Sequence, residues 1–174
     1  AFRFVLPDGK AGYYEANGRS LKRFFLKSPL KFKPRITSRF SYSRRHPVLN
    51  VQRAHLGVDY AAPVGAPVVA VSNGVVTRAG WSGDAGRLVA VRHSSGYESM
   101  YLHLSSVAVR VGQRVGQGEL VGRVGSSGLS TGPHLDYRLK KNGTFVNPIT
   151  EHRRMPPGDP IPAALMAAFT AERD

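Results

Sequence analysis

His and Asp residues lie close together at two places in the chain, in patterns typical of metal ligands. His55 and Asp59 are four residues apart in one apolar run, and His134 and Asp136 are two residues apart in another. Residues i and i+4 share a face on a strand or a helix, and residues i and i+2 share a face on a strand, so each pair could hold one ion. A third imidazole, His103, lies between them in sequence. This inventory is that of a catalytic zinc site with an open coordination position.

The composition limits the partners and the chemistry of the chain. A total of 25 Lys and Arg against 11 Asp and Glu gives a formal net charge of +14, so the surface should attract polyanions or anionic cell-surface material. The absence of Cys excludes disulfides and thiolate zinc ligands. No zinc-finger spacing, aromatic RNA-binding strand or basic helical repeat occurs, so we predict no nucleic-acid partner.

Membrane and export signals are also missing from this sequence. No apolar run approaches the roughly 20 residues that a membrane-spanning helix needs. The first residues lack a signal-peptide pattern. We expect the sequence to be a mature or excised piece, with any export signal or membrane anchor outside it.

Short Val-rich runs punctuated by glycine fill the chain from residue 55 onward. This texture is typical of an antiparallel all-β domain and not of alternating strands and helices. Asn73-Gly74 and Asn142-Gly143 predict hairpin turns. The strands that we predict in this part cover residues 67–71, 74–77, 87–93, 97–104, 119–124 and 134–139.

The predicted fold is therefore mainly β: a compact antiparallel β-sheet domain with an open groove. The sheet should form the floor of the groove, and the walls should be loops near residues 41–53, 79–86, 94–97 and 126–133. Strands over residues 2–6 and 12–15 predict a short N-terminal hairpin extension, and in the tail only residues 163–172 look helix-forming.

Three segments follow from this pattern. We expect residues 1–27 to be a hairpin left from a preceding domain. Residues 28–150 should form the main domain, and residues 151–174 a tail with a short helix.

Three motifs carry a family resemblance. They are HLGVD from His55 to Asp59, YLHL around His103, and GLSTGPHLDYR, which contains His134 and Asp136. Together they resemble the lysostaphin/LytM-type zinc metallopeptidases, which cut peptide bonds in bacterial cell-wall peptidoglycan. The resemblance covers roughly residues 36–150. The lead-in ITSRF at residues 36–40 is similar to that of Gram-negative members.

The resemblance implies a role for each candidate site residue. His55 and Asp59 would bind one zinc ion, and the third ligand position, the last residue of a His-x-His motif in the family, is Asp136 here. His103 and His134 would be the catalytic pair beside the zinc-bound water. One of them would take the proton of the attacking water and the other would stabilise the oxyanion, and the sequence leaves open which does which.

The carboxylate at residue 136 departs from the family pattern. Zinc accepts carboxylate oxygen, so three-point coordination is still possible. Two anionic ligands should weaken the Lewis acidity of the ion and raise the pKa of its bound water. Harder oxygen ligands should also widen acceptance toward manganese and other divalent ions.

Substrate contacts are expected from Tyr101, Ser130 and Thr131. The competing interpretations are core packing for a strand tyrosine and turn formation for Ser130 and Thr131. Trp81 could cover substrate, although packing is favoured. The remaining His residues, His46, His93 and His152, lack the spacing of the two clusters, and we predict no ligand role for them.

The resemblance implies an endopeptidase of peptidoglycan stem peptides that acts in the periplasm or elsewhere in the extracytoplasmic envelope. The Gram-negative lead-in favours the bond between D-alanine and diaminopimelate over a glycine bridge. The alternative is a non-catalytic LytM-like module that binds the wall or activates a partner hydrolase. Hairpins similar to those of lipoyl carrier domains also occur, but the Lys that such a domain modifies is absent from their tips.

Overall fold

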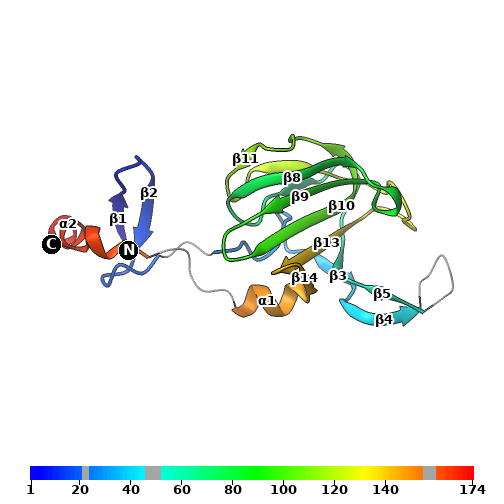
Figure 1. The fold of residues 1–174 in the computed structure, drawn as a ribbon, viewed down its shortest axis with the longest axis horizontal. Coiled ribbons are helices and arrows are strands. Elements are labelled where there is room, and N and C mark those ends of the chain that lie inside the picture. Colours follow the sequence, from blue (N-terminus) through cyan, green and yellow to red (C-terminus); the bar gives the residue numbers. More distant parts are fainter. Residues whose placement is uncertain (21–23, 46–51, 155–159) are drawn as a thin grey trace. The chain divides into compact units, whose positions relative to one another are not determined.

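The computed structural model describes residues 1–20, 24–45, 52–154 and 160–174. The chain forms two compact units, drawn in Figure 1. The smaller unit combines Ala1–Phe25 with Arg154–Asp174, and the larger unit is Leu26–Arg153. Each unit is described by itself below.

The smaller unit joins the two ends of the chain around its own core. Its elements are the antiparallel strands β1 (Phe2–Val5) and β2 (Ala11–Tyr14), a 3-10 turn (Ala163–Leu165) and helix α2 (Met166–Arg173). Phe169 of α2 is buried, and its ring lies edge-on to Phe4 at 5.5 Å and to Tyr14 at 6.0 Å between centroids. The predicted N-terminal hairpin and C-terminal helix are confirmed, and they share one apolar cluster with Ile161.

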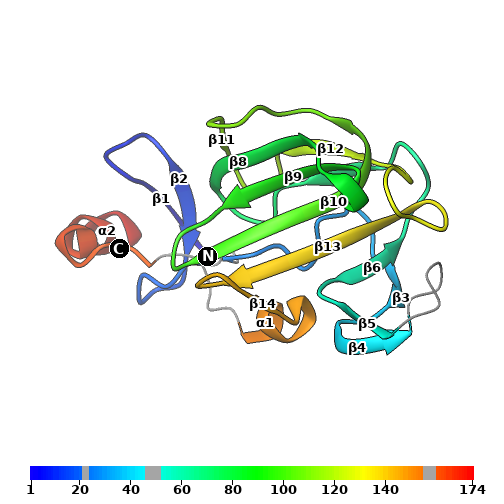
Figure 2. The ribbon, with the colours of Figure 1, turned by 45° about the vertical axis from the view of Figure 1, so that its right-hand side comes forward.

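The larger unit is built on an antiparallel sheet, which Figure 2 shows from a second direction. Its main strand order is β11-β8-β9-β10-β13-β6-β3, with β12 pairing to β10 and β7, and β14 pairing to β13. Strands β4 and β5 form a separate hairpin. The bounds are β3 (Arg35–Ser38), β4 (Ser41–Arg45), β5 (Gln52–His55), β6 (Val58–Ala61), β7 (Pro67–Val69), β8 (Gly74–Trp81), β9 (Arg87–Arg92), β10 (Tyr97–Val107), β11 (Arg114–Val115), β12 (Leu120–Val124), β13 (His134–Lys141) and β14 (Thr144–Val146).

The side chains of strand β13 alternate between the apolar core on one side of the sheet and a second face that carries Asp136 and Arg138, called the functional face below. Leu135, Tyr137 and Leu139 are fully buried on one side. Side chains alternate along a strand, so Asp136 and Arg138 project from the other side. Their partners on β10 are Leu102 and Met100, respectively. Directly opposite residues of paired strands share a face, so these two apolar side chains lie on the same side as Asp136. There they form a cluster with Leu88 and Ala90 of β9.

The two predicted hairpin turns have different outcomes. Asn142 and Gly143 have φ of 50° and 82° and connect the paired strands β13 and β14, as a two-residue turn of this type requires. The prediction at Asn73-Gly74 is wrong, because the strands on either side of it do not pair with each other. β7 pairs with β12, and β8 pairs with β9 and β11.

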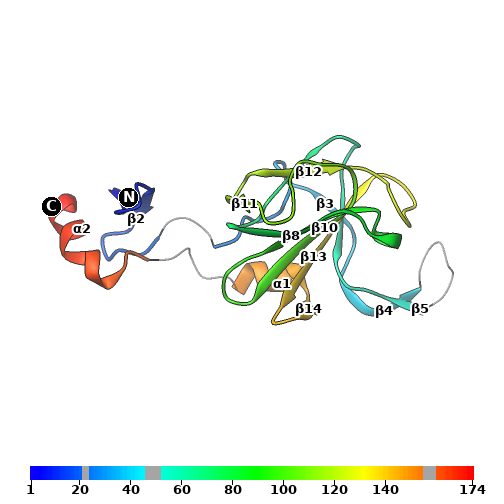
Figure 3. The ribbon, with the colours of Figure 1, turned by 45° about the horizontal axis from the view of Figure 1, so that its top comes forward.

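Helix α1 (Pro148–Arg154) was missed by the sequence analysis, which expected a helix only near the C-terminus. The side-chain Oδ1 of Asn147 accepts a hydrogen bond of 3.1 Å from the backbone N–H of Ile149, and proline occupies the first helical position. Asn-Pro was therefore a readable start signal. Figure 3 shows α1 beside β14. Within the described residues, no helix has both the length and the apolar character needed to span a membrane.

Candidate metal centre

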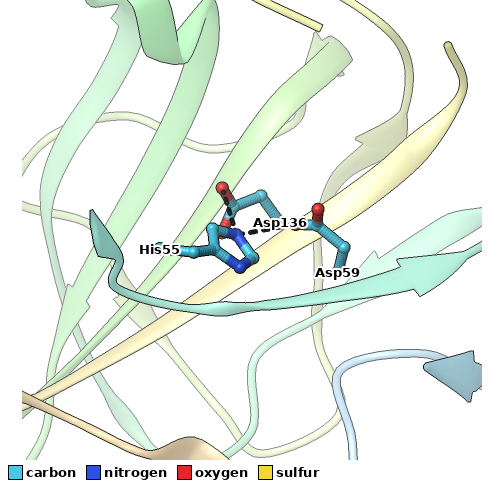
Figure 4. Close-up of side chains that lie close together, drawn as sticks. All are labelled: His55, Asp59 and Asp136. Atoms are coloured by element: carbon cyan, nitrogen blue, oxygen red, sulfur yellow. Dashed lines mark ion pairs between the residues drawn. The ribbon is translucent and has the colours of Figure 1, made fainter. Parts of the chain in front are cut away.

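Three side chains from neighbouring strands meet on the functional face of the sheet (Figure 4). They are His55 at the end of β5, Asp59 in β6 and Asp136 in β13, and their ligand atoms all lie within 4.8 Å of one another. His55 Nε2 is 3.0 Å from Asp59 Oδ1 and 3.4 Å from Asp136 Oδ2. The pairing of β6 with β13 places Asp59 directly opposite Asp136, which brings the two carboxylates together.

Backbone carbonyl groups fix the orientation of three imidazole rings at the site. The Nδ1 atom of His55 is 3.1 Å from the carbonyl oxygen of Arg39. The Nδ1 atom of His103 is 2.7 Å from that of Ser127, and the Nδ1 atom of His134 is 2.8 Å from that of Gly132. A carbonyl can only accept, so Nδ1 carries the hydrogen in each neutral ring. Each Nε2 then presents its lone pair to the centre, as metal ligands and general bases require.

A buried oxygen at the centre fits a bound cation. Among the described residues, Asp59 Oδ1 is a buried side-chain atom that makes no hydrogen bond, although it lies 3.0 Å from His55 Nε2. Two lone pairs that face each other at this distance need a proton or a metal ion between them, because a buried carboxylate oxygen without a partner is costly. One imidazole and two carboxylates form a donor set that zinc accepts.

The two remaining imidazoles flank this cluster. His103 Nε2 lies 3.9 Å from Asp136 Oδ2, and His134 Nε2 lies 3.7 Å from Asp59 Oδ1. The ring centroids of His103 and His134 are 5.1 Å apart. The two rings therefore stand side by side next to the cluster, where they could exchange protons with a molecule bound there.

His103 reaches this position through an irregular stretch of β10. Its φ is 60°, in the left-handed region that non-glycine residues rarely adopt, and the pairing of β10 with β9 shifts register between Tyr101 and Leu104. A bulge re-aims a side chain that regular alternation would send to the other face. Such strain costs about 1–3 kcal/mol and is typical of functional sites.

Ser127 connects the strand that bears His103 to the loop that orients its ring. Its hydroxyl donates to the carbonyl of Leu104 at 2.7 Å and accepts the backbone N–H of Arg87 at 3.0 Å. Its own carbonyl accepts from His103 Nδ1. The sequence analysis did not single out Ser127, because its hydrogen bonds join segments about 20 to 40 residues apart.

The charges at the centre change the pKa values of its members. Burial lowers the pKa of His55, but its interactions with Asp136 and Asp59 raise it to about 9. Burial raises the pKa of Asp136, but the hydrogen bond with His55 and the adjacent Arg138 hold it well below its usual range. Burial lowers the pKa of His103 from its ordinary value. In the metal-free protein a proton on His55 therefore stands where a cation would bind.

The residues predicted to contact substrate have different positions. Tyr101 is fully buried, and its hydroxyl accepts the backbone N–H of Val71 and contacts Ser99, so the predicted substrate contact is wrong. The Ser130 hydroxyl lies 3.3 Å from His134 Nδ1, and Thr131 is exposed beside it. A substrate contact by these two residues stays a prediction.

The other imidazoles lie in separate environments. His93 contacts the Asn73 carbonyl and the Ser99 hydroxyl, and His152 contacts the Leu26 carbonyl and the Tyr137 hydroxyl. His46 lies outside the described residues. The loop at residues 94–97 is not beside the site, because Tyr97 pairs with Lys141 at the far end of β10 and β13 from the pair of Leu102 with Asp136.

Known proteins share both the sequence pattern and the fold. The model of the family described as Peptidase family M23 matches residues 53–148. Peptidoglycan DD-endopeptidase ShyC of Vibrio cholerae is 44% identical over 149 residues, which cover 86% of this chain and 34% of that protein. The crystal structure of a zinc containing peptidase from Vibrio cholerae matches with a TM-score of 0.69 at 34% identity, over 84% of this chain and 45% of that chain.

A second solved structure is matched over nearly its whole length. The catalytic domain of lysostaphin from Staphylococcus simulans has a TM-score of 0.61 at 29% identity, over 69% of this chain and 92% of that chain. By contrast, this chain spans about a third of the length of the curated relatives that it matches.

Proposed function

Because the chain belongs to peptidase family M23, we propose that it is a metal-dependent endopeptidase that hydrolyses peptide cross-links of bacterial peptidoglycan. The observation that carries this proposal is the convergence of three Nε2 atoms on the buried carboxylate of Asp136 and the half-buried carboxylate of Asp59. The similarity to proteins named as peptidoglycan DD-endopeptidases supports the substrate class.

One zinc ion is the cofactor that we propose. His55 Nε2 and the carboxylates of Asp59 and Asp136 would hold it. When bound, zinc would supply a Lewis acid that polarises the scissile carbonyl and lowers the pKa of water. The matched structure described as a zinc containing peptidase supports this choice of metal.

His103 and His134 would handle protons. Each has its Nδ1 hydrogen committed to a backbone carbonyl, so its Nε2 can accept the proton of an attacking water. A ring that has taken this proton can donate a hydrogen bond to the oxyanion or pass the proton to the leaving amine. The burial that lowers the pKa of His103 keeps this ring neutral near pH 7.

The bond between D-alanine and diaminopimelate is the cleavage site that we propose. The relatives named DD-endopeptidases support it. The net charge of +14 suits a polymer whose stem peptides carry carboxylates. The site of action would be the periplasm or another extracytoplasmic compartment, where peptidoglycan lies.

Metal analysis combined with peptidoglycan digestion tests this function. Zinc content would be measured for the wild type, His134→Ala and Asp136→Ala, and released fragments of diaminopimelate-type peptidoglycan would be identified by mass spectrometry. Arg114→Ala is the matched control, because this residue is exposed on β11 at the opposite edge of the sheet.

The expected result is about one zinc per wild-type chain and cleavage at D-alanine. Cleavage should be lost in both site variants and kept in Arg114→Ala. A wild-type protein that binds the wall but holds no zinc and releases no fragments would overturn the proposal. That result would favour the non-catalytic module instead.

A further inference from the structure

Asp136 is bound on both of its oxygens by Arg138. The guanidinium Nε lies 3.2 Å from Asp136 Oδ1, and Nη2 lies 3.0 Å from Oδ2. The residues are two apart on β13, so both side chains leave the same face of the strand. A two-point contact of this kind fixes the plane of a carboxylate as well as its position. The same Oδ2 atom lies 3.4 Å from His55 Nε2, at the proposed metal centre.

The surroundings hold the pair in place. The Arg138 guanidinium carbon lies 5.9 Å from the centre of the Phe145 ring on β14, within the range of a cation–π contact. Gly57 leaves the space that the pair occupies. A Cβ atom at residue 57 would lie 2.5 Å from Asp136 Oδ1 and 2.6 Å from Arg138 Cγ. Gly57, in the HLGVD motif, therefore leaves room for the ion pair between Asp136 and Arg138.

The pair also changes the charge of the donor set. With a neutral His55, the carboxylates of Asp59 and Asp136 contribute two negative charges, and the guanidinium cancels one of them. The remaining charge of about −1 is that of a set of two neutral imidazoles and one carboxylate, the set that the resemblance implies. Nearby charge controls the properties of a bound metal, so this compensation matters for function.

We propose that Arg138 is a positioning residue for the metal ligand Asp136, and that the two side chains act together as one ligand unit of zero net charge in place of an imidazole. This inference rests on the proposed function only in its assumption that a metal binds. It makes the carboxylate at residue 136 a working substitution and not a sign of a lost site. Arg138 orients Oδ2 toward the centre and offsets the extra negative charge.

Zinc affinity in four proteins tests the unit. They are the wild type, Arg138→Gln, Asp136→His and the double variant, each titrated with zinc against a chromophoric chelator at one pH. In the wild-type background, Arg138→Gln should weaken zinc binding about 10- to 100-fold, as loss of an outer partner of a ligand does. In the Asp136→His background the same change should tighten binding several-fold, because the guanidinium no longer has a carboxylate to pair with and repels the cation.

Two further variants sharpen the test. Arg138→Lys keeps the charge but loses the two-point contact, so its zinc affinity should fall between those of the wild type and Arg138→Gln. Lys140→Gln is the matched control. Lys140 lies on the same face of β13 as Arg138 and also contacts Phe145, but among the described residues it has no ion pair with Asp136. The zinc affinity of this variant should stay within about twofold of the wild type.

The outcomes separate this inference from the proposed function. An equal effect of Arg138→Gln in both backgrounds would overturn the ligand unit while leaving the peptidase intact. A wild-type protein that binds no zinc would overturn both. If circular dichroism shows that Asp136→His does not fold, Asp136→Asn takes its place, because it also removes the carboxylate and predicts the same reversal of sign.

Discussion

Three imidazole rings at the site depend on backbone carbonyl oxygens for their tautomer and direction. This dependence makes the loop at residues 126–132 part of the chemistry, because it carries the carbonyls that bind His103 and His134. Ser127 is the anchor of that loop, since its hydroxyl contacts the start of β9 and the end of the bulge in β10. The residue acts through His103 and not on the substrate.

The Ser127→Ala variant should therefore separate turnover from binding. Without the hydroxyl the carbonyl of residue 127 can shift, and His103 loses its alignment. We expect kcat on a soluble cross-linked peptide to fall about 10- to 100-fold, the size that small misplacements produce. KM and zinc affinity should change by less than about threefold.

Ser105→Ala is the control for this variant, because its hydroxyl also bonds to a backbone carbonyl but its side chain is exposed. Equal kcat values for Ser127→Ala and the wild type would show that the loop holds His103 without the Ser127 hydroxyl. A parallel loss of zinc affinity would point to general disruption of the site.

At the level of the strands, β13 and the turn before β6 form the centre of the site. Asp59 and Asp136 face each other because β6 and β13 pair in one register, and a shift by one residue would move Asp136 to the core side. The close approach of these segments leaves no room for a side chain at Gly57. A Cβ there would also lie 2.7 Å from the carbonyl oxygen of Tyr137.

Gly57→Ala should disturb both stability and metal binding. The added methyl group meets backbone as well as side chain, so we expect a loss of about 1–3 kcal/mol in the free energy of unfolding. Zinc affinity should fall at least tenfold, since the Asp136 carboxylate must move. Urea unfolding and zinc titration measure the two effects.

Gly116→Ala provides the comparison for this experiment. Its added Cβ would meet no atom closer than 3.9 Å, and its φ is not in the left-handed region. This variant should keep the zinc affinity and stability of the wild type. If both glycine variants behave alike, the close approach at Gly57 is not a constraint.

For the molecule as a whole, the two compact units have separate apolar cores. Phe169→Ala should destabilise the smaller unit by about 3–5 kcal/mol, because its buried ring contacts Phe4 and Tyr14. Hydrogen exchange followed by mass spectrometry should show faster exchange in residues 1–20 and 160–174. Exchange in residues 52–153 and zinc affinity should be unchanged. Faster exchange throughout would contradict the prediction that the loss of the Phe169 ring affects the smaller unit alone.

Stability of the larger unit should depend on pH through His152. Burial lowers the pKa of this residue from 6.5 to about 4, despite its hydrogen bond to the Leu26 carbonyl. Between these values the unfolded chain binds a proton that the folded chain does not. The contribution of neutral His152 is thus complete above pH 6.5 and is lost as the pH falls toward 4, by up to about 3 kcal/mol.

Urea unfolding of the wild type and His152→Gln at several pH values between 4 and 7 measures this effect. Other groups titrate alike in both proteins, so the difference between the two curves isolates His152. The wild type should lose stability more steeply with falling pH than the variant. Parallel curves would rule out a role for His152.

The sequence predicted which side chains gather at the centre, because three motifs resemble those of a known family and part of the evidence is local. Alternation along a strand places His134 and Asp136 on one face, whatever the strand pairs with. The strands over residues 87–92 and 134–141 were readable for the same reason. Helix α1 was equally local, and its Asn-Pro start signal was overlooked.

Tertiary structure decided what depends on segments far apart in the chain. It buried Tyr101 behind the sheet, paired β7 with β12 instead of β8, and placed carbonyls behind the rings of His55 and His103. It also paired Arg138 with the proposed ligand Asp136, two residues away on the same strand. This ion pair fits only because Gly57, in a motif far away in sequence, has no side chain. Sequence spacing gives the face of a side chain, but only the packed fold gives its neighbours.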